Sequence, residues 1–157
     1  MKKILFPIVA ALFIVSCSSD ETSVYVPTIP TPSTNTLKAT INGTEYTFDT
    51  FQVDTQTHTT PDHTYVDLEV RATISTDATK EISFSLEQDV PGTETIYFFY
   101  LMNGDEEFDT DHTGAAFTHN VTTNANKHIV GTFSGALARF DNSSTAEITN
   151  GSFDIKY

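Results

Sequence analysis

Apolar and polar residues alternate along much of the chain after residue 36, which is the pattern of half-buried β-strands. Residues 37–41 alternate in this way, and the alternation resumes at Tyr46 and Phe48. Between them, Asn42-Gly43 favours the positive backbone angles of a two-residue turn, so this segment predicts a β-hairpin. Two later segments each place their apolar residues on one face: Val66, Leu68, Val70, Ala72 and Ile74, then Ile82, Phe84 and Leu86.

The segment 96–102, Ile-Tyr-Phe-Phe-Tyr-Leu-Met, shows no alternation. A continuous apolar run of this length predicts a strand that is covered on both faces or lines a cavity. We expect Tyr97 and Tyr100 to lie on opposite faces of this strand, so that at least one reaches a cleft. A phenol in a cleft can stack on a sugar or close an apolar pocket, which makes these two tyrosines candidate ligand-binding residues.

Further strands are predicted at residues 115–121, 128–140 and 146–157, the last with a bulge or tight bend at Asn150-Gly151. No segment has the periodicity of an amphipathic helix, and the 27 Thr residues favour strands. We therefore expect one all-β domain over residues 37–157. Its predicted fold is an antiparallel β-sandwich, or a small barrel, of seven to eight strands.

The N-terminus has the layout of a secretory signal peptide. A basic start is followed by an apolar run of 12 residues over positions 4–15, which is shorter than the about 20 residues that span a bilayer. The run ends in Ile14-Val15-Ser16-Cys17, which resembles the lipobox of bacterial lipoproteins. This resemblance implies a signal peptide over residues 1–16, cleaved before Cys17, and acyl chains such as palmitate attached through the Cys17 sulfur.

Residues 17–36 combine the predicted lipidated Cys with a Pro-, Ser- and Thr-rich segment that predicts a disordered, extended linker. The acidic stretch 18–21 resembles the export signal of surface lipoproteins in Bacteroidetes-type bacteria. The short motifs at 39–43, 131–135 and 148–153 are similar to small β-domain lipoproteins of the same group. The resemblance implies a lipid-anchored, surface-exposed location at the outer membrane, and it supplies no catalytic residues.

The charge balance excludes some partners. Eight Lys and Arg residues stand against 21 Asp and Glu residues, which gives a net charge of −13. A polyanion of this strength is repelled by nucleic-acid phosphates and anionic lipid headgroups. The expected partners are the outer membrane, through the lipid, and an extracellular protein or glycan.

The most acidic segment, residues 103–114, is a candidate calcium loop. Asp109 and Asp111 copy the first two ligand positions of a calcium-binding loop, and Asp105 adds a third carboxylate nearby. The twelfth position is occupied by Asn120 rather than Glu, and no helix flanks the segment. The other interpretation is a solvated acidic loop with no cofactor.

The predicted role is a non-enzymatic binding or interaction module, with residues 54–62 and 105–111 as its contact loops. One alternative is a small-ligand carrier whose apolar cavity is lined by residues 96–102. Another is a carbohydrate-active hydrolase that uses two of the many carboxylates.

Overall fold

The computed structural model describes residues 35–112 and 116–157, and all regular elements in these ranges are β-strands. The predicted signal peptide, Cys17 and nearly all of the linker lie outside the described residues. Within the described ranges, no helix is long and apolar enough to cross a membrane. The strands are β1 (Thr36–Ile41), β2 (Thr44–Phe48), β3 (Thr50–Thr59), β4 (Thr64–Ile74), β5 (Asp77–Glu87), β6 (Gly92–Thr93), β7 (Ile96–Asn103), β8 (Glu106–Asp109), β9 (Phe117–Ala125), β10 (His128–Ala138) and β11 (Thr145–Lys156).

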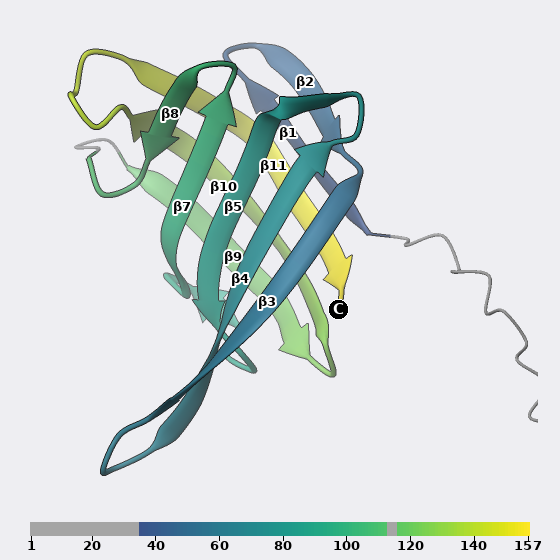
Figure 1. Ribbon diagram of the computed structural model, residues 1–157, viewed down its shortest axis with the longest axis vertical. Helices are drawn as coiled ribbons and strands as arrows, with labels where there is room; N and C mark the ends of the chain where they lie inside the picture. Colours follow the sequence, from purple (N-terminus) through teal and green to yellow (C-terminus); the bar gives the residue numbers. More distant parts are fainter. Residues whose placement is uncertain (1–34, 113–115) are drawn as a thin grey trace, which may run out of the picture. The chain divides into compact units, whose positions relative to one another are not determined.

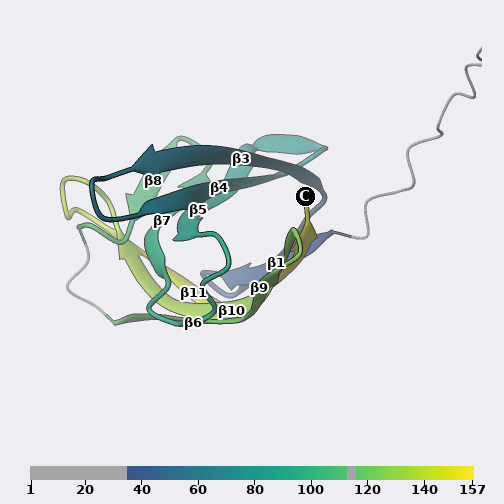
Figure 2. The same ribbon diagram turned by 90° about the horizontal axis from the view of Figure 1, so that it is seen from below.

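These strands form one antiparallel sheet that is folded into two layers (Figures 1 and 2). One layer has the order β2-β1-β11-β10-β9, and the other has the order β8-β7-β5-β4-β3. β10 belongs to both layers, because residues 128–135 pair with β9 while Ala138 pairs with Asp109 of β8. The order ends at β2 and β3, so the sheet is not closed into a barrel.

The predicted all-β antiparallel fold is confirmed, but the predicted number of strands is too low. The described residues contain eleven strands, and the three that the pattern missed are β3, β6 and β8. β6 and β8 are two and four residues long, too short to show a period. β3 is rich in Thr and Gln, and the contact loop predicted over residues 54–62 is wrong because most of it belongs to this strand.

Two predicted turns are confirmed. Asn42 and Gly43 have φ angles of 49° and 81°, and they join β1 to β2 in the expected hairpin. Asn150 has a φ of 53°, and the register between β10 and β11 shifts at this point. The shift is the bulge predicted from Asn150-Gly151.

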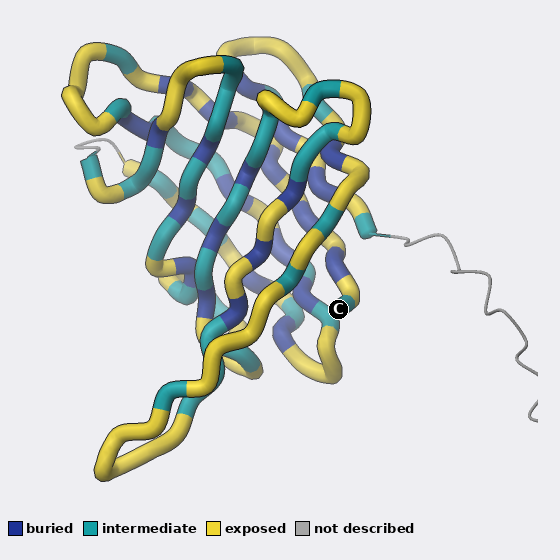
Figure 3. Tube along the Cα trace, in the orientation of Figure 1, coloured by how far each residue is buried: buried dark blue, intermediate teal, exposed yellow. Residues whose placement is uncertain are grey.

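The core lies between the layers, where alternate side chains of most long strands are buried, whereas the edge strand β3 contributes only the partly buried Phe51 and Val53 (Figure 3). Its centre is a group of phenylalanine rings, including Phe84, Phe99 and Phe133. The Phe133 ring occupies the space that a Cβ at residue 151 would need, so only glycine fits at this position beside the ring. The Phe133 ring of β10 therefore packs directly against Gly151 of β11.

Candidate functional site

A groove of about 350 Å³ lies on the outer face of the β3-β4-β5-β7 layer. The core residues Leu68, Val70 and Phe84 point inward from these strands, so their neighbours in the sequence point outward. We call this site the Tyr97 groove. Its outward lining residues are Asp54 and Gln56 of β3, Asp67 and Glu69 of β4, Ser85 of β5 and Tyr97 of β7.

A β-bulge places Tyr97 in the groove. Ser85 pairs with Phe98 and Leu86 pairs with Ile96, so Tyr97 is the extra residue of β7. Its side chain is 55% exposed. Tyr100 also faces outward because it pairs with Ser83, which lies between the buried residues of β5.

Two predictions about β7 are therefore wrong. Tyr97 and Tyr100 lie on the same outer face rather than on opposite faces, because the bulge shifts the alternation by one residue. The strand is also not covered on both faces. Phe99 and Leu101 are buried in the shared core, whereas Tyr97 is exposed. The inward side chains of β7 pack in this core and give no support to a carrier cavity lined by residues 96–102.

The pKa values of both tyrosines are raised. Partial burial raises the pKa of Tyr97 to about 12, and a hydrogen bond to the Asp67 carboxylate with its negative charge adds to the rise. Partial burial also raises the pKa of Tyr100, with the charges of Glu107 and Glu81 acting in the same direction. At neutral pH each phenol is therefore an uncharged hydrogen-bond donor beside carboxylates.

Two side chains next to the groove orient its carboxylates. The Nε2 atom of His58 lies 3.0 Å from an Asp67 carboxylate oxygen, and the His58 ring stacks on Tyr65 at 4.9 Å between centroids. The amide of Gln52 donates a 2.7 Å hydrogen bond to the Asp54 carboxylate. These contacts hold two acids at fixed positions on neighbouring strands.

The structure does not bring the predicted calcium ligands together. Asp105 lies in the turn before β8, whereas Asp109 ends that strand and Asp111 follows it. Asp109 is engaged by His112, whose backbone N–H lies 3.1 Å and whose Nδ1 lies 2.6 Å from one carboxylate oxygen. Among residues 35–112 and 116–157, no group of three His, Cys, Asp or Glu side chains is placed to hold a metal. The positions of these acids therefore give no support to a calcium site.

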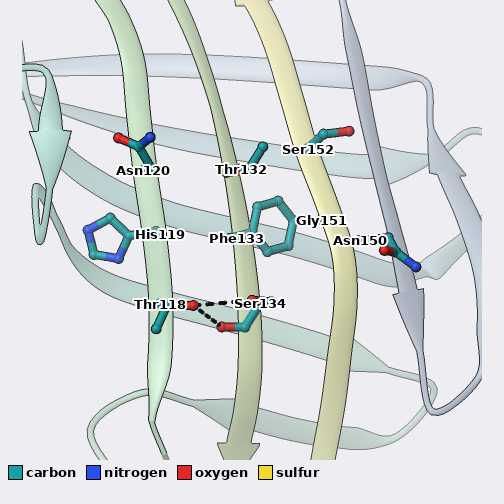
Figure 4. A pocket seen from close by; sticks show the side chains of 9 residues that line it. All are labelled: Thr118, His119, Asn120, Thr132, Phe133, Ser134, Asn150, Gly151 and Ser152. Atoms are coloured by element: carbon teal, nitrogen blue, oxygen red, sulfur yellow. Dashed lines mark hydrogen bonds between the residues drawn. The ribbon is translucent and has the colours of Figure 1, made fainter.

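A second hollow, of about 480 Å³, lies on the outer face of the β9-β10-β11 layer (Figure 4). The Thr118 hydroxyl is 3.1 Å from the Ser134 hydroxyl, and this pair involves no histidine. No local pattern in the sequence predicts this hollow, because its walls come from three strands that meet only in the folded sheet. Its remaining side chains include the uncharged polar residues Asn120, Thr132, Asn150 and Ser152.

His119 borders this hollow but serves a structural role. Its Nε2 accepts a 2.9 Å hydrogen bond from the Ile96 N–H, at the start of β7. Burial lowers the pKa of His119, so the ring is neutral at pH 7 and can accept this bond. The bond ties β9 to the residue that precedes Tyr97.

The carboxyl groups with resolved pKa shifts do not behave as general acids. The pKa values of Asp49, Asp77 and Asp141 are lowered, chiefly by hydrogen bonds from Ser75, Thr79 and Ser143. A glycoside hydrolase requires one carboxyl group with a raised pKa. These carboxyl groups therefore provide no argument for hydrolysis.

Comparisons of the chain with family models, curated proteins and solved structures found no match.

Proposed function

We propose that this chain is a lipid-anchored lipoprotein of the outer membrane, exposed at the cell surface, that acts as a non-enzymatic binding module. The anchor rests on the lipobox-like residues 14–17 and the linker that follows them. The binding role is carried by one observation, the Tyr97 groove. Its half-exposed aromatic ring stands beside fixed carboxylate and amide groups in a hollow of ligand-binding size.

The anchor is tested by replacing Cys17 with Ser. We expect the wild-type chain to incorporate labelled palmitate and to sediment with membranes, because two or three acyl chains hold a protein stably in a bilayer. The Cys17→Ser chain should lose both properties. A Ser18→Ala chain is the matched control and should keep both. A Cys17→Ser chain that still sediments with membranes as the wild type does would contradict the proposed anchor.

The binding role is tested by thermal shift on the full-length protein. Neutral oligosaccharides, fatty acids and basic peptides are added in turn to the wild type and to the Tyr97→Ala variant. We expect at least one class to raise the Tm of the wild type, because a ligand that binds only the folded state stabilises it. The same ligand should raise the Tm of the variant much less. If none of these classes gives a Tyr97-dependent rise, the groove is not a binding site.

A further inference from the structure

We propose that the Tyr97 groove binds a cationic segment of a partner protein, with Lys or Arg side chains on alternate residues. This inference rests on the proposed binding function and adds the chemical class of the partner. It follows from the charge pattern of one sheet face, from the exposed ring in it, and from the spacing of the strand residues.

Like charges lie directly opposite each other at the groove. In the register of β3 and β4, Asp54 is the partner of Glu69. In the register of β4 and β5, Asp67 is the partner of Glu87. Side chains of directly opposed strand residues are neighbours, and like charges in these positions destabilise a sheet. The sheet therefore carries two adjacent repulsive pairs. His58 already contacts Asp67 of the second pair at 3.0 Å, so the Asp54–Glu69 pair is the one that a bound cation would chiefly relieve.

Few basic groups on this face neutralise these acids. Within the described part of β3, β4, β5 and β7, the outward-facing basic side chains are Arg71, which bonds Glu81 at 3.2 Å, and His58, whose Nε2 lies 3.0 Å from Asp67. Neither of these two side chains forms an ion pair with Asp54 or Glu69. Lys80 points the other way, since its Nζ bonds Asn103 at 2.6 Å and lies over the Tyr46 ring. The potential in the groove is therefore negative, and complementary to a positively charged partner.

Tyr97 selects an organic cation over a bare metal ion. An ammonium or guanidinium group is attracted to the face of an aromatic ring, and the Tyr97 side chain is 55% exposed beside Asp67. The carboxylates are also spread over neighbouring strands, and they do not form a cluster that could hold a metal. Spread charges around a ring fit the planar head of Arg or the ammonium of Lys.

The spacing of the acids points to an extended peptide. Asp67 and Glu69 are two residues apart on β4, so the two repulsive pairs are separated by about 7 Å. Side chains on one face of an extended peptide repeat at the same distance. The other layer has no such charge pattern at its hollow, whose named lining residues Asn120, Thr132 and Ser152 are uncharged. Of these two hollows, the Tyr97 groove is therefore the one whose lining favours a cation.

The test measures binding of a fluorescent short peptide that alternates Arg and Ser to the full-length protein in detergent. We expect Asp54→Asn/Glu69→Gln to weaken binding about tenfold, because two carboxylates near the ligand are lost. The matched control, Glu45→Gln/Glu147→Gln, removes the same charge from exposed positions on the other layer and should change binding by less than about twofold. Tyr97→Ala should weaken binding about two- to fivefold, whereas Tyr97→Phe keeps the ring and should bind as the wild type does.

Three outcomes would overturn the inference. The first is equal weakening by the two double variants, which would mean that the net charge of the whole chain attracts the peptide. The second is equal binding of a block peptide, with all Arg residues before all Ser residues, which would remove the argument from spacing. The third is Tyr97-dependent binding of a neutral oligosaccharide without binding of the Arg peptide. That third outcome would leave the groove as a binding site, so the proposed function would stand while the cationic partner would not.

Discussion

Replacing Phe99 with Ala should lower the free energy of unfolding by about 3–5 kcal/mol, the largest effect that we expect from a single substitution. Phe99 is fully buried, and its ring contacts Phe117 and Phe133 at centroid distances of 4.7 and 4.9 Å. Removing the ring leaves a cavity where both layers meet, and the surrounding rings cannot fill it without leaving their own positions. Urea unfolding of the full-length chain measures the loss.

Phe140 provides the matched control for this substitution, because its side chain is 81% exposed and contacts the His112 ring. Phe140→Ala should change the free energy of unfolding by less than about 1 kcal/mol. If Phe99→Ala were as mild as Phe140→Ala, the two layers would not share the core described above.

The second large effect is expected at Asn124, the buried polar residue of β9. Its Oδ1 accepts a 3.0 Å hydrogen bond from the Asp89 N–H, and its Nδ2 donates to the carbonyl oxygens of Glu87 and Val90 at 2.8 and 3.2 Å. Asn124→Ala leaves backbone groups without partners and should cost about 2–3 kcal/mol of stability in urea unfolding.

Asn120→Ala, on the exposed face of the same strand, is the control and should change stability by less than about 0.5 kcal/mol. Similar losses in the two variants would mean that solvent replaces the three hydrogen bonds of Asn124. Together with His119, Asn124 ties β9 to the segment that leads from β5 into the bulge at Tyr97.

Local patterns in the sequence were enough to predict the strands that alternate clearly and the turns with special backbone angles. Asn42-Gly43 is an example, because its turn depends on two adjacent residues and the strands beside them. β3 was missed because Thr and Gln occupy most of its positions. Its place in the sheet comes from ten residue pairs with β4 rather than from its own apolar content.

The Tyr97 groove could not be predicted from the sequence, because it depends on the register between strands. Tyr97 was singled out from its apolar segment, but its direction depends on a bulge that appears only in the pairing of β7 with β5. Asp54 and Glu69 are 15 positions apart in the chain, and nothing in either segment alone indicates that they lie opposite each other. Anchoring through Cys17 remains a prediction from the lipobox resemblance, because that residue lies outside the described ranges.

The position of β3 at the end of the strand order has one more consequence. An edge strand offers unpaired backbone groups to which a second molecule can add its own strand. β3 has no proline or lysine to prevent this, but it carries Asp54 next to the acids of β4. A second copy docked edge to edge would bring its own Asp54, and the β4 acids beside it, close to those of the first. The acids that shape the groove thus also discourage self-association of the sheet.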